Sequence, residues 1–203
     1  MGRLREFLGS NREQVWRQLA EQIGASYVDG GFWRGDKVQA QVKDWTVTLD
    51  TYTVSNGKSS VTFTRMRVPY VNPDGFRFRI YRKGLFSGLG KMLGMQDIEV
   101  GDAEFDEAFI VKGNEESKVR SLLSSPRTRQ LMQAQPAFRL EVKDSEGVFG
   151  PTFPEGVDEL CFQVAGVISD AVVLKGLFDL FAEVLDVLCH MGSAYENDPH
   201  LAL

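Results

Sequence analysis

The sequence predicts an α+β domain in which antiparallel strands form a meander sheet and helices pack on that sheet. Three observations predict it. Between residues 27 and 82, apolar and polar side chains alternate with the period of two that is typical of half-buried strands. Two turn sequences interrupt this region and favour antiparallel hairpins. Elsewhere, helical periodicity predicts an N-terminal helix, two short mid-chain helices and a long C-terminal helix packed on the sheet.

The N-terminal helix is expected over residues 11–23. Ser10 followed by Glu13 is a capping-box pattern, in which each side chain satisfies a backbone amide at the start of a helix. Gly24 suits the left-handed residue that ends a helix. One apolar stripe lies on the predicted helix at helical spacing, and it consists of Val15, Trp16, Leu19 and Ile23.

The strands are rich in β-branched and aromatic residues, which favour a pleated, half-buried surface. An Asn-Gly pair at residues 56–57 predicts a hairpin between the second and third of them, and Asn-Pro-Asp-Gly at residues 72–75 predicts a turn after the third. We therefore expect four strands, over residues 38–43, 45–54, 59–70 and 76–82.

Arginines gather on one face of the expected hairpin around residues 72–75. A register that pairs Arg67 with Arg79 places the apolar side chains on one face and Arg65, Arg67, Arg77 and Arg79 on the other, whereas a slip of one residue would mix the faces. Four close guanidinium groups repel one another unless something negative neutralises them. The internal candidate is the acidic segment 97–107. The alternatives are an acidic partner protein, a phosphate-bearing ligand and an anionic lipid surface.

The segment after these strands, residues 84–95, is rich in glycine and apolar side chains. We interpret it as a flap, with Phe86 and Leu89 as candidate contacts, that packs on the core or meets a partner. Residues 97–111 are expected to form an irregular strand region.

The remaining chain predicts two short helices, two strands and a long helix. The first short helix is expected over residues 115–124 with Asn114 as its cap, and the second over 126–134 with Pro126 at its first position. The strands are expected over residues 138–143 and 159–168. The final helix, residues 170–191, carries an apolar face wide enough to cover a sheet.

Length and charge limit the classes of protein. A chain of 203 residues suits one domain, which we assign to residues 1–203, with 1–9 and 193–203 expected to be loosely ordered. The net charge of −5 argues against binding nucleic acid, because that task usually requires a basic surplus. No segment resembles a secretion signal or a transmembrane helix, so we expect a cytoplasmic protein.

Few side chains suggest catalysis. The carboxylates between residues 97 and 107 could hold Mg²⁺ or Ca²⁺, but their spacing is not that of an EF-hand, and a solvated acidic surface is the simpler interpretation. Cys161 and Cys189 are expected to be buried thiols. A catalytic dyad of Cys161 and His190 is geometrically possible, although His190 is more simply explained as a cation that interacts with the dipole at a helix C-terminus. We therefore expect no catalytic residues, no metal and no cofactor.

Three stretches of the sequence are similar to uncharacterised bacterial proteins that are classed as domains of unknown function. The stretches are TRMR at residues 64–67, FRFRIY at 76–81 and GMQDIEVGDAEFDEAF at 94–109, and Leu122 and Leu123 follow them. The resemblance covers residues 16–195. It implies a bacterial origin and assigns no activity and no functional residue.

The leading hypothesis from the sequence is a non-catalytic, soluble domain that binds a protein partner or a second copy of itself. The flap and the arginine face would form the contact surface. The first alternative is a metal-assisted hydrolase that uses carboxylates of the acidic segment 97–107. The second is a carrier of a small ligand or lipid, with its pocket between the sheet and the C-terminal helix.

Overall fold

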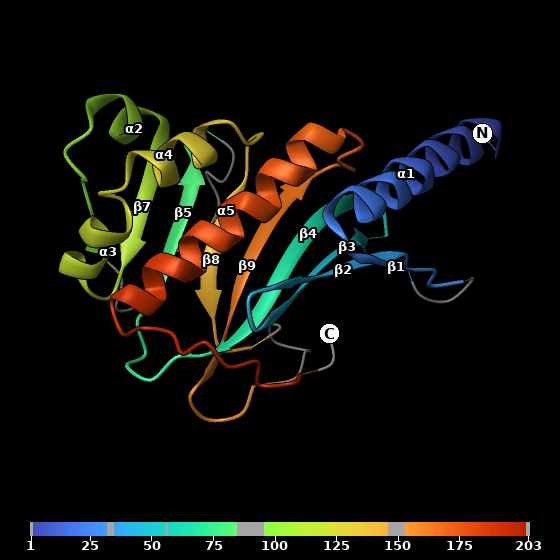
Figure 1. Ribbon diagram of the computed structural model, residues 1–203. Helices are drawn as coiled ribbons and strands as arrows, with labels where there is room; N and C mark the ends of the chain where they lie inside the picture. The colour runs from blue at the N-terminus through green and yellow to red at the C-terminus, as the bar shows by residue number, and fades with distance from the viewer. Residues whose placement is uncertain (1, 32–34, 56, 85–95, 146–152, 202–203) are drawn as a thin grey trace.

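A computed structural model describes residues 2–31, 35–55, 57–84, 96–145 and 153–201. In this part of the chain, nine strands form one antiparallel sheet, and five helices lie on one side of it (Figure 1). This arrangement confirms the predicted α+β class. The long helix α5 runs along the sheet, with α4 on one side of it and α1 on the other.

Only the first four strands form a meander, in which strands that follow one another in the sequence are also neighbours in the sheet. From one edge to the other the sheet runs β1-β2-β3-β4-β9-β8-β5-β7-β6, and every neighbouring pair is antiparallel. The strands are β1 (Ser26–Val28), β2 (Lys37–Val42), β3 (Trp45–Ser55), β4 (Ser60–Val71), β5 (Phe78–Arg82), β6 (Gln96–Asp97), β7 (Phe109–Gly113), β8 (Arg139–Lys143) and β9 (Val157–Ala165).

The predicted hairpin between β4 and β5 is wrong. Strands β9 and β8 lie between them, so Arg67 is paired with Cys161 on β9, and Arg79 is paired with Glu141 on β8. The turn does reverse the chain, but Asn72 ties it to the start of β9: its amide donates to the Gly156 carbonyl at 2.8 Å. A turn sequence specifies where a chain changes direction, and it does not specify the strand that becomes the neighbour.

The predicted division of faces is nevertheless correct. Met66 and Val68 of β4 and Ile80 of β5 are fully buried on the side of the helices. Because side chains alternate across a strand, Arg65, Arg67 and Arg79 lie on the other side of the sheet. The alternation survives the change of partner strands because it depends on each strand alone.

The helices are α1 (Gly2–Ile23), α2 (Ala103–Ala108), α3 (Glu116–Leu122), α4 (Pro126–Gln133) and α5 (Ala171–His190). The capping box predicted at Ser10 is wrong, because α1 begins at Gly2 and Ser10 lies inside it. The start of α4 is as predicted: Ser125 caps it by accepting from the Thr128 amide, with Pro126 at the first helical position.

The acidic region differs from its prediction as a strand. It contains the short strand β6, the helix α2 and the strand β7. Asp102 caps α2 by accepting from the Phe105 amide at 3.1 Å, and Asp106 accepts from the amides of Val100 and Gly101. Aspartates that bond nearby amides favour turns and helix starts over a ladder, and this competition was not recognised in the sequence.

The cap predicted for α3 is also wrong. Glu115, not Asn114, occupies the capping position, and its side chain makes no capping bond. The Asn114 side chain instead accepts from the Arg77 amide at 2.9 Å and donates to the Gly75 carbonyl at 2.8 Å. Asn114 therefore holds the chain that leads into β5.

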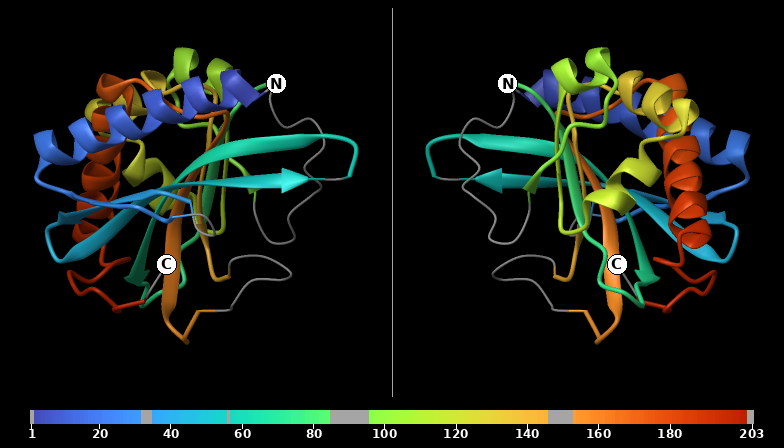
Figure 2. Two further views of the ribbon diagram at one scale, coloured as in Figure 1. Left: turned by 90° about the vertical axis from the view of Figure 1, so that its right-hand side faces the viewer. Right: turned by 90° about the vertical axis from the view of Figure 1, so that its left-hand side faces the viewer.

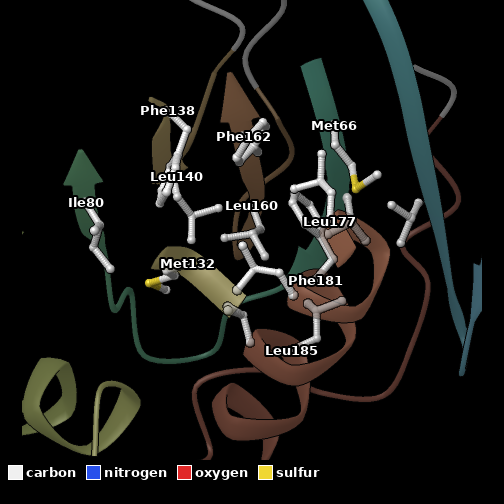
Figure 3. Close-up of a cluster of buried hydrophobic side chains, with 14 of the residues drawn as sticks. Met66, Ile80, Met132, Phe138, Leu140, Leu160, Phe162, Leu177, Phe181 and Leu185 are labelled. Carbon is white, nitrogen blue, oxygen red and sulfur yellow. The ribbon is translucent and has the colours of Figure 1, made fainter. Parts of the chain in front are cut away.

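The core lies between the sheet and the helices. Figure 3 shows Leu177, Phe181 and Leu185 of α5 gathered with Leu160 of β9, and Met132 of α4 lies beside them; all five are fully buried. Burial of apolar side chains on this scale is the main stabilising contribution to such a fold.

The chain beyond α5 packs on the body, although residues 193–203 were expected to be loosely ordered. Ser193 and Ala194 are buried, Tyr195 forms a bridge with Val71, and the Asp198 carboxylate accepts from the Thr46 amide at 3.1 Å. Among the helices of the described residues, none has the length and apolar character needed to cross a membrane.

Candidate functional site

Charged side chains cover the sheet face that points away from the helices, which we call the open face. In Figure 2 the five described helices lie on the other side of the sheet. Five neighbouring strands, from β3 to β5 in the sheet order, contribute to this set. We call it the ion-pair layer, and it consists of Asp50, Arg65, Arg67, Arg79, Arg139, Glu141, Lys143 and Glu159.

Asp50 of β3 joins the two arginines of β4. Its carboxylate accepts from Arg65 Nε at 2.9 Å and Nη2 at 2.8 Å, and from Arg67 Nη2 at 2.6 Å. Burial alone would raise the pKa of the Asp50 carboxyl, but the Arg65 hydrogen bond and the charge of Arg67 outweigh it and hold that pKa below its ordinary value. Asp50 is therefore ionised, and its single negative charge is shared by both guanidinium groups.

Glu141 of β8 plays the same part for the neighbouring strands. Arg79 Nε on β5 donates to Glu141 Oε2 at 2.6 Å, and Arg139 Nε lies 3.1 Å from Oε1. The Glu141 side chain is almost completely buried. A buried carboxylate shared by two arginines fixes the relative positions of β5 and β8.

Glu159 of β9 is fully buried at the centre of the layer. Lys143 Nζ lies 2.9 Å from its Oε1, and Arg67 Nη1 lies 3.8 Å from its Oε2. Cys161, two residues along the same strand, is fully buried between Arg67 and Glu141 in the ladder. Burial, followed by the negative charge of Glu159, raises the pKa of the Cys161 thiol, which is therefore protonated at neutral pH.

The fourth predicted arginine, Arg77, is separate from the other three. It lies before β5 and pairs with Asp158 Oδ1 at 3.0 Å and Asp144 Oδ2 at 2.7 Å. The structure thus brings Arg65 and Arg67 together and places Arg79 three strands away from them, with a different carboxylate.

The predicted source of neutralising charge is wrong. Among the described residues, the carboxylates paired with the four arginines are Asp50, Glu141, Asp144, Asp158 and Glu159, none of which belongs to the acidic segment 97–107. Within that segment, Asp97 pairs with Lys112 and Asp102 pairs with Arg129. For Arg65, Arg67 and Arg79 the counter-charges lie on neighbouring strands, where facing side chains are close to each other.

Neither of the catalytic arrangements considered from the sequence is assembled. Across the described residues, no group of three or more His, Cys, Asp or Glu side chains is placed to hold a metal ion. Cys161 lies on the open face, whereas His190 lies at the end of α5 on the opposite side of the sheet, with its Nδ1 2.8 Å from the Asp186 carbonyl oxygen. A Cys161–His190 dyad is therefore excluded.

A second feature of the open face is a two-stranded arm, which we define as residues 51–55 of β3 and 60–63 of β4. The β2 ladder on β3 stops at Asp50, and the β9 ladder on β4 stops at Thr64, so the two strands continue as a pair. Figure 2 shows this hairpin projecting away from α5.

The two faces of the arm differ in chemistry. On one face the hydroxyls of Thr53 and Thr62 lie 2.9 Å apart. The other continues the open face and carries what we call the apolar strip, which consists of Tyr52, Val54, Val61 and Phe63. The Tyr52 and Phe63 rings stack with centroids 5.2 Å apart, and the two valines are 52% and 45% exposed.

The apolar strip was not predicted from the sequence. A signal was present: in β3 the core-facing positions hold Val47 and Leu49, but the same alternation continues into Thr51 and Thr53. Beyond residue 50 the apolar side chains therefore change to the face that points away from the helices. Of the predicted contacts, Phe86 and Leu89 lie outside the described residues.

Comparisons with known proteins place the fold and nothing finer. Neither a protein-family model nor a curated protein matches the sequence. The fold is similar to the crystal structure of the mycobacterial trehalose monomycolate transport factor A, TtfA, with a TM-score of 0.53 and 11% sequence identity. The match covers 87% of this chain and 93% of that one.

Proposed function

We propose that this chain is a binding domain that contacts a protein partner through the apolar strip of the arm. One observation carries the proposal: two half-exposed valines and a stacked aromatic pair lie together on an arm that projects beyond the sheet. Clustered apolar side chains that remain exposed in a folded protein are typical of contact surfaces, and aromatic residues contribute strongly to binding.

The ion-pair layer has a supporting part in this proposal. Arg65 joins the two features, because its guanidinium binds Asp50 and lies 4.8 Å from the centroid of the Tyr52 ring. The base of the arm is thereby held by a two-point ion pair and a cation–π contact. We assign Arg65 and Arg67 to this positioning role and Arg79 to the joining of β5 to β8, since each binds a carboxylate of the same chain.

Site-specific photo-crosslinking tests the proposal. A photoreactive phenylalanine analogue is placed at Val54, and in a control variant at Val172, which is 81% exposed on α5. We expect a crosslinked protein at position 54 and not at position 172. For the purified complex, changing Val54 and Val61 together to Ser should weaken affinity by about tenfold or more, because both contacts lose their apolar burial.

Val172→Ser should leave the affinity of the same complex unchanged. Equal crosslinking at both positions, or affinity insensitive to the double substitution, would contradict the proposal. Circular dichroism of each variant separates lost binding from lost folding.

A second candidate function is a carrier of a lipid or small ligand. The shared fold with a protein described as a transport factor favours this candidate, and the apolar strip offers a surface for a hydrocarbon chain. Native mass spectrometry of freshly purified protein discriminates between the two, because a carrier would retain a bound mass that organic extraction removes.

A further inference from the structure

In the described part of the chain, the outer edge of β3 is unpaired along the arm. Pairing with β2 ends at Lys37 and Asp50, but β3 continues to Ser55. Gly35 still lies against the start of this stretch, since a Cβ there would be 3.4 Å from the Thr51 carbonyl oxygen. From Tyr52 to Ser55, no strand of the described residues pairs with this edge.

The outer edge of β4 is different. The Gly166 amide donates to the Thr62 carbonyl at 2.8 Å, and Gly166 forms a bridge with Phe63. The Thr64 hydroxyl then donates to the Gly166 carbonyl at 2.8 Å. The chain that follows β9 thus covers the β4 edge at Thr62 and Phe63, whereas no described strand lies beside β3 from Tyr52 to Ser55.

The open edge lacks the usual protection against pairing. Edge strands of natural proteins are commonly blunted by a charged side chain, a proline or a bulge. Residues 52–55 are Tyr, Thr, Val and Ser, and the β3–β4 register runs through them without a bulge. Three of these four are β-branched or aromatic, the types that favour an extended backbone.

We propose that residues 52–55 of β3 accept an extended segment of a partner protein as an additional strand of the sheet. This inference rests on the proposed function and names the kind of partner. Backbone hydrogen bonds would supply affinity, and alternate side chains of the segment would supply specificity. Those that continue the apolar strip would be apolar, and those beside Thr53 and Ser55 would be polar.

The size of the surface favours a short segment over a second copy of this chain. A stable interface between folded proteins buries about 800 Å² on each partner. The apolar strip contains four side chains, and Tyr52 and Phe63 are already partly covered by each other. Such a surface suits a few residues of an extended peptide. The backbone of that peptide would add hydrogen bonds to the edge of β3, and these would supplement the small apolar contact.

Peptide selection followed by hydrogen exchange tests this proposal on the full chain. The probe is a phage-displayed library of random peptides of about twelve residues. We expect selected peptides with alternating apolar and polar residues, and slowed amide exchange within residues 52–55 of the wild-type protein when such a peptide binds. Val54→Lys should weaken binding by about tenfold or more, and Val172→Lys should not.

The outcomes separate this proposal from the proposed function. If Val61→Ser weakens binding but the amides of residues 52–55 stay unprotected, the strip binds and the added strand is wrong. If no peptide is selected, or if neither Val61→Ser nor Val54→Lys weakens binding of the selected peptides, the added strand is wrong, and the crosslinking test decides the proposed function separately. A dimer in light scattering that Val54→Lys dissociates would overturn the proposal in favour of a second copy. The exchange measurement needs no variant and so does not depend on how Val54→Lys folds.

Discussion

Asp50 and Arg65 stand opposite each other across the β3–β4 ladder. Arg65 donates two hydrogen bonds to the Asp50 carboxylate, from Nε to Oδ1 at 2.9 Å and from Nη2 to Oδ2 at 2.8 Å. The pair lies where the pairing of β3 with β2 stops and the arm begins. Arg67 reaches the same carboxylate at 2.6 Å, so one aspartate holds two residues of β4. The base of the arm is consequently a charged joint, not an apolar one.

Replacing this aspartate should destabilise the protein. Asp50→Asn removes the negative charge shared by Arg65 and Arg67, whose side chains are largely buried. Removing one partner from a buried ion pair is costly, and we expect the free energy of unfolding to fall by about 3 kcal/mol. Urea denaturation measures it.

The matched control is Asp97→Asn. Asp97 also pairs with a cation, Lys112, but its side chain is 75% exposed. An exposed ion pair contributes at most about 1 kcal/mol to stability. If Asp97→Asn lowered the free energy of unfolding as much as Asp50→Asn does, the larger effect expected for the buried Asp50 ion pairs would be contradicted.

Stability should depend on pH in the acidic range. The pKa of Asp50 is lower in the folded protein than in the unfolded chain. The unfolded state therefore binds more protons between the folded pKa and the ordinary aspartate pKa of about 4. The Asp50 contribution is complete above that range and is lost as the pH falls through the folded pKa.

Denaturation of the wild type and of Asp50→Asn between about pH 7 and pH 3 tests this expectation. The variant should lose less stability on acidification than the wild type. Parallel losses in both proteins would show that other carboxyls carry the dependence, among them Asp74. Burial would raise the pKa of Asp74, but hydrogen bonds from Lys118, the Phe76 amide and Ser193 together outweigh burial and lower that pKa.

Gly113 should not tolerate a side chain. A Cβ at this position of β7 would lie 2.4 Å from Cγ2 of Val119, which is fully buried in α3. We expect Gly113→Ala to lower the free energy of unfolding by about 1–3 kcal/mol through overpacking.

A double-mutant cycle with Val119→Ala identifies the cause. The second substitution removes the methyl group that clashes, so the double variant should lose less stability than the sum of the single ones. Strict additivity would rule out this contact as the origin of the effect.

The two cysteines should differ in reactivity. Cys161 is fully buried, and burial followed by the charge of Glu159 raises the pKa of its thiol. Only thiolates react rapidly with alkylating reagents. In native protein, mass spectrometry after iodoacetamide treatment should find label at the partly buried Cys189 before Cys161, which should react only after unfolding. Labelling of both at one rate would refute this assignment.

Local patterns predicted most elements correctly. The alternation in residues 38–70 and the Asn-Gly turn define β2, β3 and β4. Pro126 and the apolar periodicity define α4 and α5. The errors occurred where a side chain had two available roles: Asn114 was expected to cap α3 but holds the turn before β5, and the aspartates of residues 97–107 start a helix instead of joining a strand. Tertiary contacts decided between these roles.

The sequence by itself determined which segments are strands and which side of each strand is apolar, because these properties depend on residues a few positions apart. It also determined that Arg65 and Arg67 of β4 and Arg79 of β5 lie on the face opposite the core. Only the tertiary structure decided that β9 and β8 separate these strands, that Asp50 and Glu141 supply the counter-charges, and that the arm extends beyond its neighbours. Each of these depends on which distant strand becomes a neighbour and where its ladder stops, and that choice is made by competition among all the strands for burial and hydrogen bonds.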